Sequence, residues 1–135
     1  MVRPSDSDLG PAGHFPRRVG IDAYGNGGFR FADMSHKGSL LCLPSGMHAW
    51  DVAEPAALTL ESLRPVLDVA DELDVLFIGL GADIAAIDPA IRNAFRSRRV
   101  IVEAIGTGGA VRTYNVLLAE ERAVAAALIA VENAR

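Results

Sequence analysis

In the first half of the chain, apolar and polar positions alternate, which is the pattern of β-strands with one buried face. Apolar residues alternate with polar or small residues over 19–23 and again over 29–31, on either side of the glycine-rich segment 24–28. Two more apolar segments follow, separated by Pro44-Ser45-Gly46, a sequence that favours a tight turn. The pattern predicts a β-meander for this half of the chain.

The second half changes to helical spacing interrupted by continuous apolar segments. Apolar positions recur at helical spacing over residues 63–73, with Thr59 or Ser62 as the expected cap and Pro65 in the first turn. Residues 75–80 form a continuous apolar segment, which is typical of a strand covered on both faces. This segment predicts a buried strand after the helix.

The same alternation continues toward the C-terminus. Asp88 followed by Pro89 predicts the start of a helix, residues 100–105 predict another buried strand, and Thr107 is the expected cap of a further helix. Strands that alternate with helices in this way form a parallel sheet with right-handed crossovers. Residues 123–131 are rich in alanine and suit either a buried strand or a helix, and propensity alone favours a helix.

The bulk properties indicate one α/β domain. The chain has 135 residues, half of them apolar, and a formal net charge of −4. A domain of this length can bury one sizeable core. Residues 1–18 hold three of the seven prolines and no apolar period, so we expect a mobile lead-in followed by a single domain over residues 19–135.

Charge and hydropathy exclude several classes of partner. A nucleic-acid-binding protein usually carries a basic face, and this chain has 17 acidic residues against 13 Lys and Arg. Its longest apolar segments, 75–82 and 123–131, fall short of the length of about 20 residues that crosses a bilayer. We therefore expect no nucleic-acid partner, no transmembrane segment and a cytoplasmic location.

The single cysteine, Cys42, lies in an apolar segment and is expected to be a small buried hydrophobic residue. Together with His36 and His48 it could suggest a metal site. The spacing of six and six residues lacks the tight pairs of transition-metal sites, so no metal is expected.

The segment Gly79-Leu80-Gly81 raises the question of a bound dinucleotide. It follows a predicted strand, and Glu103 lies 22 residues beyond Gly81, near the position of a ribose-binding acid. However, Ile84 occupies the third glycine position, and the next helix starts only at Asp88. The simpler interpretation is a sharp exit from the strand, and no cofactor is expected.

A second glycine cluster, over residues 106–109, lies at a predicted helix N-terminus, where an anion or a partner's carboxylate could bind. The loops at Gly81 and at Thr107 both leave the carboxyl ends of strands, where ligands of such sheets gather. We therefore expect a pocket or partner-binding site there, and a buried Asn115 could instead pin a neighbouring loop. The candidate site residues are Gly79, Gly81, Thr107, Gly108, Arg112, Tyr114 and Asn115.

The sequences VLFIGLGAD and AIGTGGAVRTYNVLLAEERAVAAALI resemble the Mth938-domain family. The resemblance extends from about residue 19 to the end, and this chain differs at Gly109, where an alanine is expected. It implies a three-layer α/β fold with a mixed sheet, an N-terminal β-meander and a βαβαβ second half. It also implies a strand rather than a helix for residues 123–130.

The family includes mitochondrial complex I assembly factor 3, so the resemblance implies a non-catalytic interaction or assembly factor. It carries no catalytic residues, and it implies a protein partner. A homo-oligomer is compatible with the sequence. The alternative is a small-molecule- or anion-binding domain, or an enzyme, with its pocket between the Gly81 and Thr107 loops.

Overall fold

The computed structural model describes residue 9, residues 13–83 and residues 85–134. The described strands are β1 (His14–Phe15), β2 (Ala23–Gly25), β3 (Gly28–Phe31), β4 (Met34–Lys37), β5 (Ser39–Leu43), β6 (Gly46–Trp50), β7 (Val75–Gly79), β8 (Ile101–Ile105) and β9 (Val124–Leu128). The described α-helices are α1 (Arg64–Leu67), α2 (Pro89–Arg96) and α3 (Thr107–Ala119).

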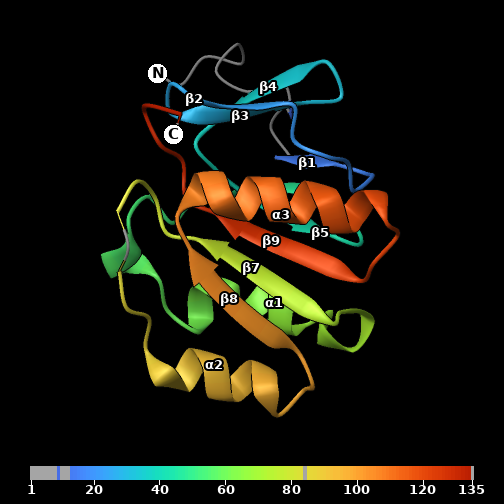
Figure 1. The fold of residues 1–135 in the computed structure, drawn as a ribbon, viewed down its shortest axis with the longest axis vertical. Coiled ribbons are helices and arrows are strands. Elements are labelled where there is room, and N and C mark those ends of the chain that lie inside the picture. The colour runs from blue at the N-terminus through green and yellow to red at the C-terminus, as the bar shows by residue number, and fades with distance from the viewer. Residues whose placement is uncertain (1–8, 10–12, 84, 135) are drawn as a thin grey trace.

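A mixed six-stranded sheet forms the middle of the molecule, in the order β1-β6-β5-β9-β7-β8 (Figure 1). β7 pairs in parallel with both β8 and β9, and β9 pairs antiparallel with β5. β2, β3 and β4 form a separate three-stranded antiparallel sheet. The mixed sheet, the meander and the β7-α2-β8-α3-β9 order confirm the predicted fold class.

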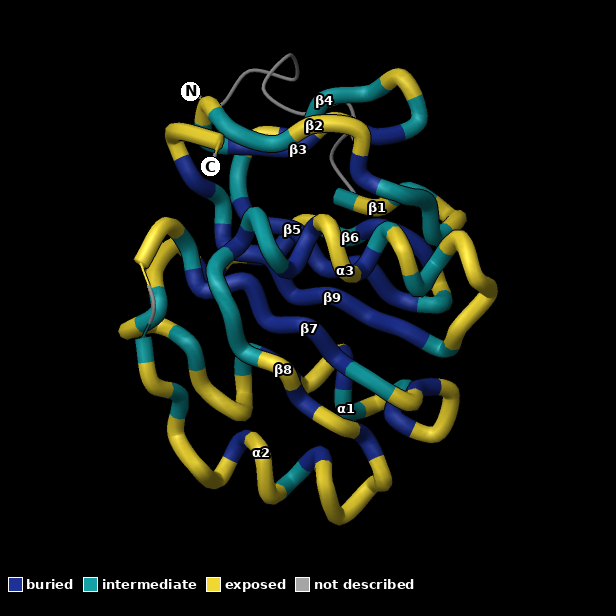
Figure 2. Tube along the Cα trace, in the orientation of Figure 1, coloured by how far each residue is buried: buried dark blue, intermediate teal, exposed yellow. Residues whose placement is uncertain are grey.

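The central sheet separates two hydrophobic cores, because successive side chains of a strand point to opposite faces. In β9, Ala126 and Leu128 belong to the core that includes α3 and β3, whereas Ala125 and Ala127 belong to the core that includes α1 and α2. Every residue of β9 is buried, as are all of β5. Figure 2 shows this buried band crossing the molecule between exposed outer elements.

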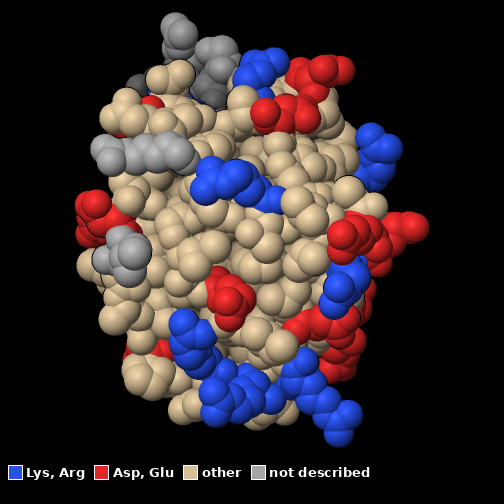
Figure 3. Space-filling model, in the orientation of Figure 1, with Lys and Arg blue, Asp and Glu red and all other residues tan. Residues whose placement is uncertain are grey.

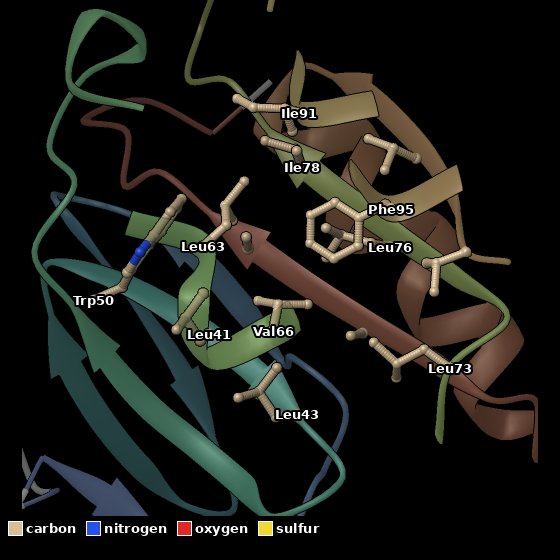
Figure 4. Packing of buried hydrophobic residues seen from close by; sticks show 14 of the residues in the cluster. Leu41, Leu43, Trp50, Leu63, Val66, Leu73, Leu76, Ile78, Ile91 and Phe95 are labelled. Atoms are coloured by element: carbon tan, nitrogen blue, oxygen red, sulfur yellow. The ribbon is translucent and has the colours of Figure 1, made fainter. Parts of the chain in front are cut away.

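Figure 4 shows the core on the α1 and α2 side of the sheet. Phe95 of α2 and Val66 of α1 are fully buried against Leu76 and Ile78 of β7. Asp88 caps α2 as predicted, since its carboxylate accepts a hydrogen bond from the Ala90 N–H at 2.9 Å. The C-terminal segment is the strand β9, as the family resemblance implied and contrary to the helix favoured by propensity.

The lead-in prediction requires a correction over its last residues. His14–Phe15 form β1, which pairs antiparallel with β6 at the edge of the central sheet. The Arg18 guanidinium donates to Val124 O at 2.7 Å, and Leu9 is buried. Residues 1–8 and 10–12, which the same prediction covered, lie outside the described residues. Segment 13–18 is therefore part of the fold.

The helix predicted over residues 63–73 is wrong as a single helix. Two 3₁₀ turns, Glu61–Leu63 and Ala70–Glu72, flank the four-residue α1. Pro65 has no N–H to donate to the preceding turn, and the Ser62 carbonyl accepts a hydrogen bond from Trp50 Nε1 at 2.9 Å. Both features interrupt a regular ladder. The Thr59 Oγ1 accepts a hydrogen bond from the Ser62 N–H at 3.0 Å, but the N-cap of the first 3₁₀ turn is Leu60.

Among the described helices, none is long and apolar enough to cross a membrane. The longest, α3, has 13 residues.

β4 was not anticipated from the sequence, because Ser35, His36 and Lys37 interrupt its apolar pattern.

Candidate functional site

The carboxyl ends of the three parallel strands meet at one edge of the sheet, which we call the carboxyl edge. It consists of residues 80–82 after β7, residues 106–109 after β8 and residues 129–131 after β9. Backbone hydrogen bonds join the three loops directly. The Leu80 N–H donates to Ile105 O at 2.8 Å, the Thr107 N–H donates to Gly81 O at 3.0 Å, and the Ile129 N–H donates to Gly79 O at 2.9 Å.

Thr107 is the central group of the carboxyl edge. Its Oγ1 donates to Ile129 O at 2.6 Å and accepts from the Gly81 N–H at 2.9 Å, and the residue is fully buried. The prediction that Thr107 caps α3 is therefore wrong. Gly106 is the N-cap, and Thr107 is the first helical residue, with its hydroxyl turned toward the other two loops. The hydroxyl joins β7, α3 and β9.

Gly79 and Gly81 serve this arrangement in different ways. A Cβ on Gly79 would lie 3.0 Å from Thr107 Cα and 3.1 Å from Leu128 Cδ2, so only glycine lets α3 approach β7 this closely. Gly81 has a φ of +93°, which side chains of L-residues rarely adopt. The chain therefore turns sharply at Gly81 as it leaves β7, while Gly79 provides the space for α3.

The dinucleotide alternative finds no geometric support. The register pairs Phe77 with Glu103, which places this acid in the middle of β8 and away from the carboxyl edge. The amide of Gly81 is already engaged by Thr107, and Asp88 starts α2 far along the chain from the glycines. A pyrophosphate beside Gly81 would therefore meet neither a free Gly81 amide nor a ribose-binding acid at the expected place.

Two hollows open at the carboxyl edge. The smaller, about 110 Å³, is lined by Tyr24, Gly81, Ala82, Gly106, Thr107, Gly108, Gly109, Val131 and Asn133. The larger, about 400 Å³, lies beside Leu80 and Ile129 and includes three acidic residues in its lining, Glu54, Asp83 and Glu132. Neither has a Lys or Arg among the described residues that line it. The charge of this region therefore opposes anion binding.

The remaining candidate residues lie away from these hollows. Tyr114 is fully buried, and its hydroxyl donates to Val19 O at 2.8 Å. Asn115 holds Ile21 on both sides, since its Oδ1 accepts from the Ile21 N–H and its Nδ2 donates to Ile21 O, each at 2.8 Å. This is the loop-pinning interpretation of Asn115. The structure thus brings together Gly79, Gly81, Thr107 and Gly108, whereas Arg112 is exposed on α3.

Cys42 is fully buried, and this burial raises the pKa of its thiol to about 12. The thiol is therefore protonated and unreactive at neutral pH. Its cross-strand partner is Met47, while His48 lies opposite Leu41, so Cys42 and His48 point to different faces of the sheet. In the described part of the chain, no group of three or more metal-ligating side chains comes together.

The face of β8 on the α3 side was not anticipated from the sequence. Ile105 packs toward the α3 side, whereas Val102 belongs to the opposite core. By alternation, Ile101, Glu103 and Ile105 share the α3 side, but α3 packs mainly on β9 and β7 and covers β8 only near Ile105. Ile101 is 65% exposed, and Val116 on α3 is 56% exposed. We call Ile101, Glu103, Ile105 and Val116 the β8–α3 surface.

Figure 3 shows the β8–α3 side of the molecule. The area over α3 and β8 carries few charged side chains, and Lys and Arg gather beyond it over α2. β8 is also an edge strand, and the Arg92 side chain of α2 donates to its Val102 carbonyl. The sequence of β8 matches that of a buried strand, so it does not reveal that Ile101 is exposed. That exposure depends on where α3 lies across the sheet.

The sequence profile of the family described as "Protein of unknown function (DUF498/DUF598)" matches residues 21–129, from before β2 to the end of β9. The chain belongs to this family. A curated relative of the DUF498/DUF598 protein is mouse NADH dehydrogenase [ubiquinone] 1 alpha subcomplex assembly factor 3, which is 30% identical over 115 residues. The match covers 85% of this chain and 62% of the mouse protein, so the chain spans less than two thirds of that relative's length.

Solved structures agree with the family assignment. A crystal structure described as an outer membrane protein from Bartonella henselae is 51% identical, with a TM-score of 0.84 over 88% of this chain and 100% of that one. A solution structure from Bordetella pertussis described as an Mth938-like domain is 25% identical, with a TM-score of 0.75 over 86% of this chain and 88% of that one. The Mth938-like fold implied by the sequence is confirmed.

Gly109, the position that differs from the family resemblance, leads to a stability prediction. It lies in the first turn of α3, and an added Cβ would lie 3.3 Å from Ile105 Cδ1, the end of a flexible, half-buried side chain. We expect Gly109→Ala to stabilise the protein by about 0.5 kcal/mol, since alanine is favoured over glycine in a helix by up to about 1 kcal/mol. Urea unfolding measures the change, and a loss of stability would show that Ile105 cannot move aside.

Proposed function

We propose that this DUF498/DUF598 protein is a non-catalytic assembly factor that binds a subunit of a membrane-bound respiratory complex, of the NADH dehydrogenase type, before that subunit is incorporated. The observation that carries the proposal is the relationship to the mouse assembly factor, which extends over 85% of this chain. A cytoplasmic location is part of the same proposal and accords with one free, buried cysteine.

The geometry of the carboxyl edge favours binding over catalysis. Its central hydroxyl, on Thr107, is buried and engaged on both sides by backbone groups. A nucleophile needs an exposed position and a neighbouring base. The hydroxyl of Thr107 instead stabilises the junction of three loops, so we assign it a structural role.

The β8–α3 surface is the place where we expect the partner subunit to bind. Ile101 and Val116 are two of the three large hydrophobic side chains that the described residues leave exposed, and both lie on this side of the sheet. Aliphatic side chains gain about 1.5–3 kcal/mol on full burial, so two of them can contribute much of a specific interface. A partner with an exposed apolar segment, such as an unassembled membrane-complex subunit, fits this surface.

We expect the paired substitution Ile101→Asp and Val116→Asp to weaken partner binding at least about tenfold, because each aspartate would have to be desolvated against an apolar partner. Affinity capture from the organism of origin, followed by mass spectrometry, measures this. The matched control is Leu60→Asp, which places the same charge at the third exposed hydrophobic residue, 37% exposed and next to α1.

The expected result is that the wild type and Leu60→Asp proteins enrich subunits of an NADH dehydrogenase-type complex, whereas the doubly substituted protein does not. Enrichment that is equal in all three proteins would contradict the proposed surface. Failure of the wild type to enrich any respiratory-complex subunit would contradict the proposed function itself.

A small-molecule site at the carboxyl edge is the second candidate. The hollow between the Gly81 and Thr107 loops measures only about 110 Å³, and the observation that favours this candidate is the larger neighbouring hollow of about 400 Å³, which Gly81 lines and the Thr107 loop does not. Its three carboxylates would select a neutral or cationic molecule rather than an anion. A thermal-shift screen tests this candidate, since any ligand of the native state raises the melting temperature. The assembly-factor proposal predicts no saturable shift with metabolites.

A further inference from the structure

His14 and His48 form a cross-strand pair at the edge of the central sheet. They lie directly opposite each other in the β1–β6 register. The Ala49 N–H donates to Gly13 O at 2.7 Å at the neighbouring position, so His14 and His48 occupy a non-hydrogen-bonded pair, in which opposed side chains lie closest. Their rings are stacked, with centroids 4.4 Å apart and planes 19° apart.

Both Nε2 atoms converge on one residue, Ser45, in the turn before β6. His14 Nε2 lies 3.2 Å from Ser45 O, and His48 Nε2 lies 2.8 Å from Ser45 Oγ. His14 and Ser45 are exposed and His48 is half-buried, so the group is open to solvent. The Nε2 atoms of His14 and His48 therefore both lie within hydrogen-bond distance of Ser45, one of its carbonyl oxygen and the other of its hydroxyl.

The backbone positions this group. Gly46 has a φ of +134°, and a Cβ there would lie 1.9 Å from Phe15 O, so glycine is required for β1 to lie against β6. The two histidines belong to segments 34 residues apart in the sequence, and without this close approach they would not meet. The pairing also explains why residues 13–18 are held in the fold.

We propose that His14, His48 and the Ser45 carbonyl form a binding site for a late divalent transition-metal ion of the Zn²⁺, Ni²⁺ or Cu²⁺ class. Imidazole is a common ligand of these ions, whereas Mg²⁺ and Ca²⁺ prefer oxygen ligands.

Binding would exchange the present hydrogen bonds for metal–ligand bonds and would turn the two rings out of their parallel stack, because each nitrogen lone pair lies in the plane of its own ring. His14 Nε2 and Ser45 O share a hydrogen bond now, and His14 becomes a ligand when its proton moves to Nδ1, a tautomer change that leaves the ring neutral. Because one ligand comes from β1 and one from β6, the ion joins the first described strand to the sheet. Metal binding should therefore stabilise the native state.

The test uses the untagged full chain, because an affinity tag of histidines would bind the same ions. Isothermal titration with Zn²⁺ or Ni²⁺ at pH 7.5 should show one site per chain, and His14→Asn or His48→Asn should each weaken binding at least about tenfold, as expected when one of few ligands is lost. Mg²⁺ should give no heat of binding. Circular dichroism of both variants confirms that they fold.

His36 provides an internal control, since the chain has three histidines and His36 is the one outside the pair. It is buried, and its Nε2 lies 2.9 Å from Ser39 O. In histidine ring NMR spectra, paramagnetic Ni²⁺ should broaden the His14 and His48 signals at one equivalent and leave His36 sharp. Unsaturable binding by the wild type, equal broadening of all three rings, or unchanged affinity in both variants would overturn the proposal.

Discussion

Thr107→Val should destabilise the protein by about 2–5 kcal/mol, the largest effect we expect from removing a single oxygen atom. Valine keeps the shape of the side chain but can neither donate to Ile129 O nor accept from the Gly81 N–H. Each buried backbone group left without a partner costs about 1–3 kcal/mol. At about 3–5 °C per kcal/mol for a domain of this size, calorimetry should show a clear fall in melting temperature.

Thr113→Val is the matched control for this substitution. Thr113 lies on the exposed side of α3, and its hydroxyl donates to Gly109 O at 3.0 Å, a helix carbonyl that water can also reach. Its loss should change the free energy of unfolding by less than about 0.5 kcal/mol. Equal effects of the two substitutions would mean that the Thr107 hydroxyl does not hold the carboxyl edge together.

Gly79→Ala should destabilise the protein by about 2–3 kcal/mol, because it adds a methyl group to a closely packed junction. The new Cβ would lie 3.0 Å from Thr107 Cα and Oγ1 and 3.1 Å from Leu128 Cδ2. Two of these atoms belong to Thr107, whose position is fixed by hydrogen bonds to both neighbouring loops, so relief requires α3 to move away from β7. Urea unfolding monitored by circular dichroism measures the loss.

Gly106→Ala is the control for the methyl group itself. Gly106 has a φ of −62°, and its added Cβ would meet Gly81 O at 3.4 Å, an ordinary contact. We expect a change below about 1 kcal/mol, the scale of an N-cap preference. If Gly79→Ala were as mild as Gly106→Ala, the close approach of α3 to β7 could not be the reason for the glycine at position 79.

The elements that follow local rules were predictable from the sequence. Asp88 and Pro89 mark the start of α2 through capping geometry, and the apolar segments of β7 and β8 read as strands buried in a parallel sheet. β9 shows the limit of such rules. Its three central alanines favour a helix, but β5 and β7 lie on either side of the segment, so tertiary pairing decides the outcome.

The candidate site could be predicted only in part. The meeting of the Gly81 and Thr107 loops follows from parallel strands, and the structure brings them together. The direction of the Thr107 hydroxyl does not follow, because a threonine before a helix is usually a cap and here it is the first helical residue. The exposure of Ile101 depends on where α3 lies across the sheet, which no local pattern of residues encodes.

The carboxyl edge is a structural junction, and the β8–α3 surface is the proposed site of partner binding. Hydrogen–deuterium exchange of the protein, alone and in complex with the captured partner, distinguishes these two regions most directly. We predict that the partner protects the amides of Val102 and Ala104 in β8 and the outer side of α3 near Val116. Protection confined to residues 80–82 and 106–109, with β8 exchanging as in the free protein, would contradict the account.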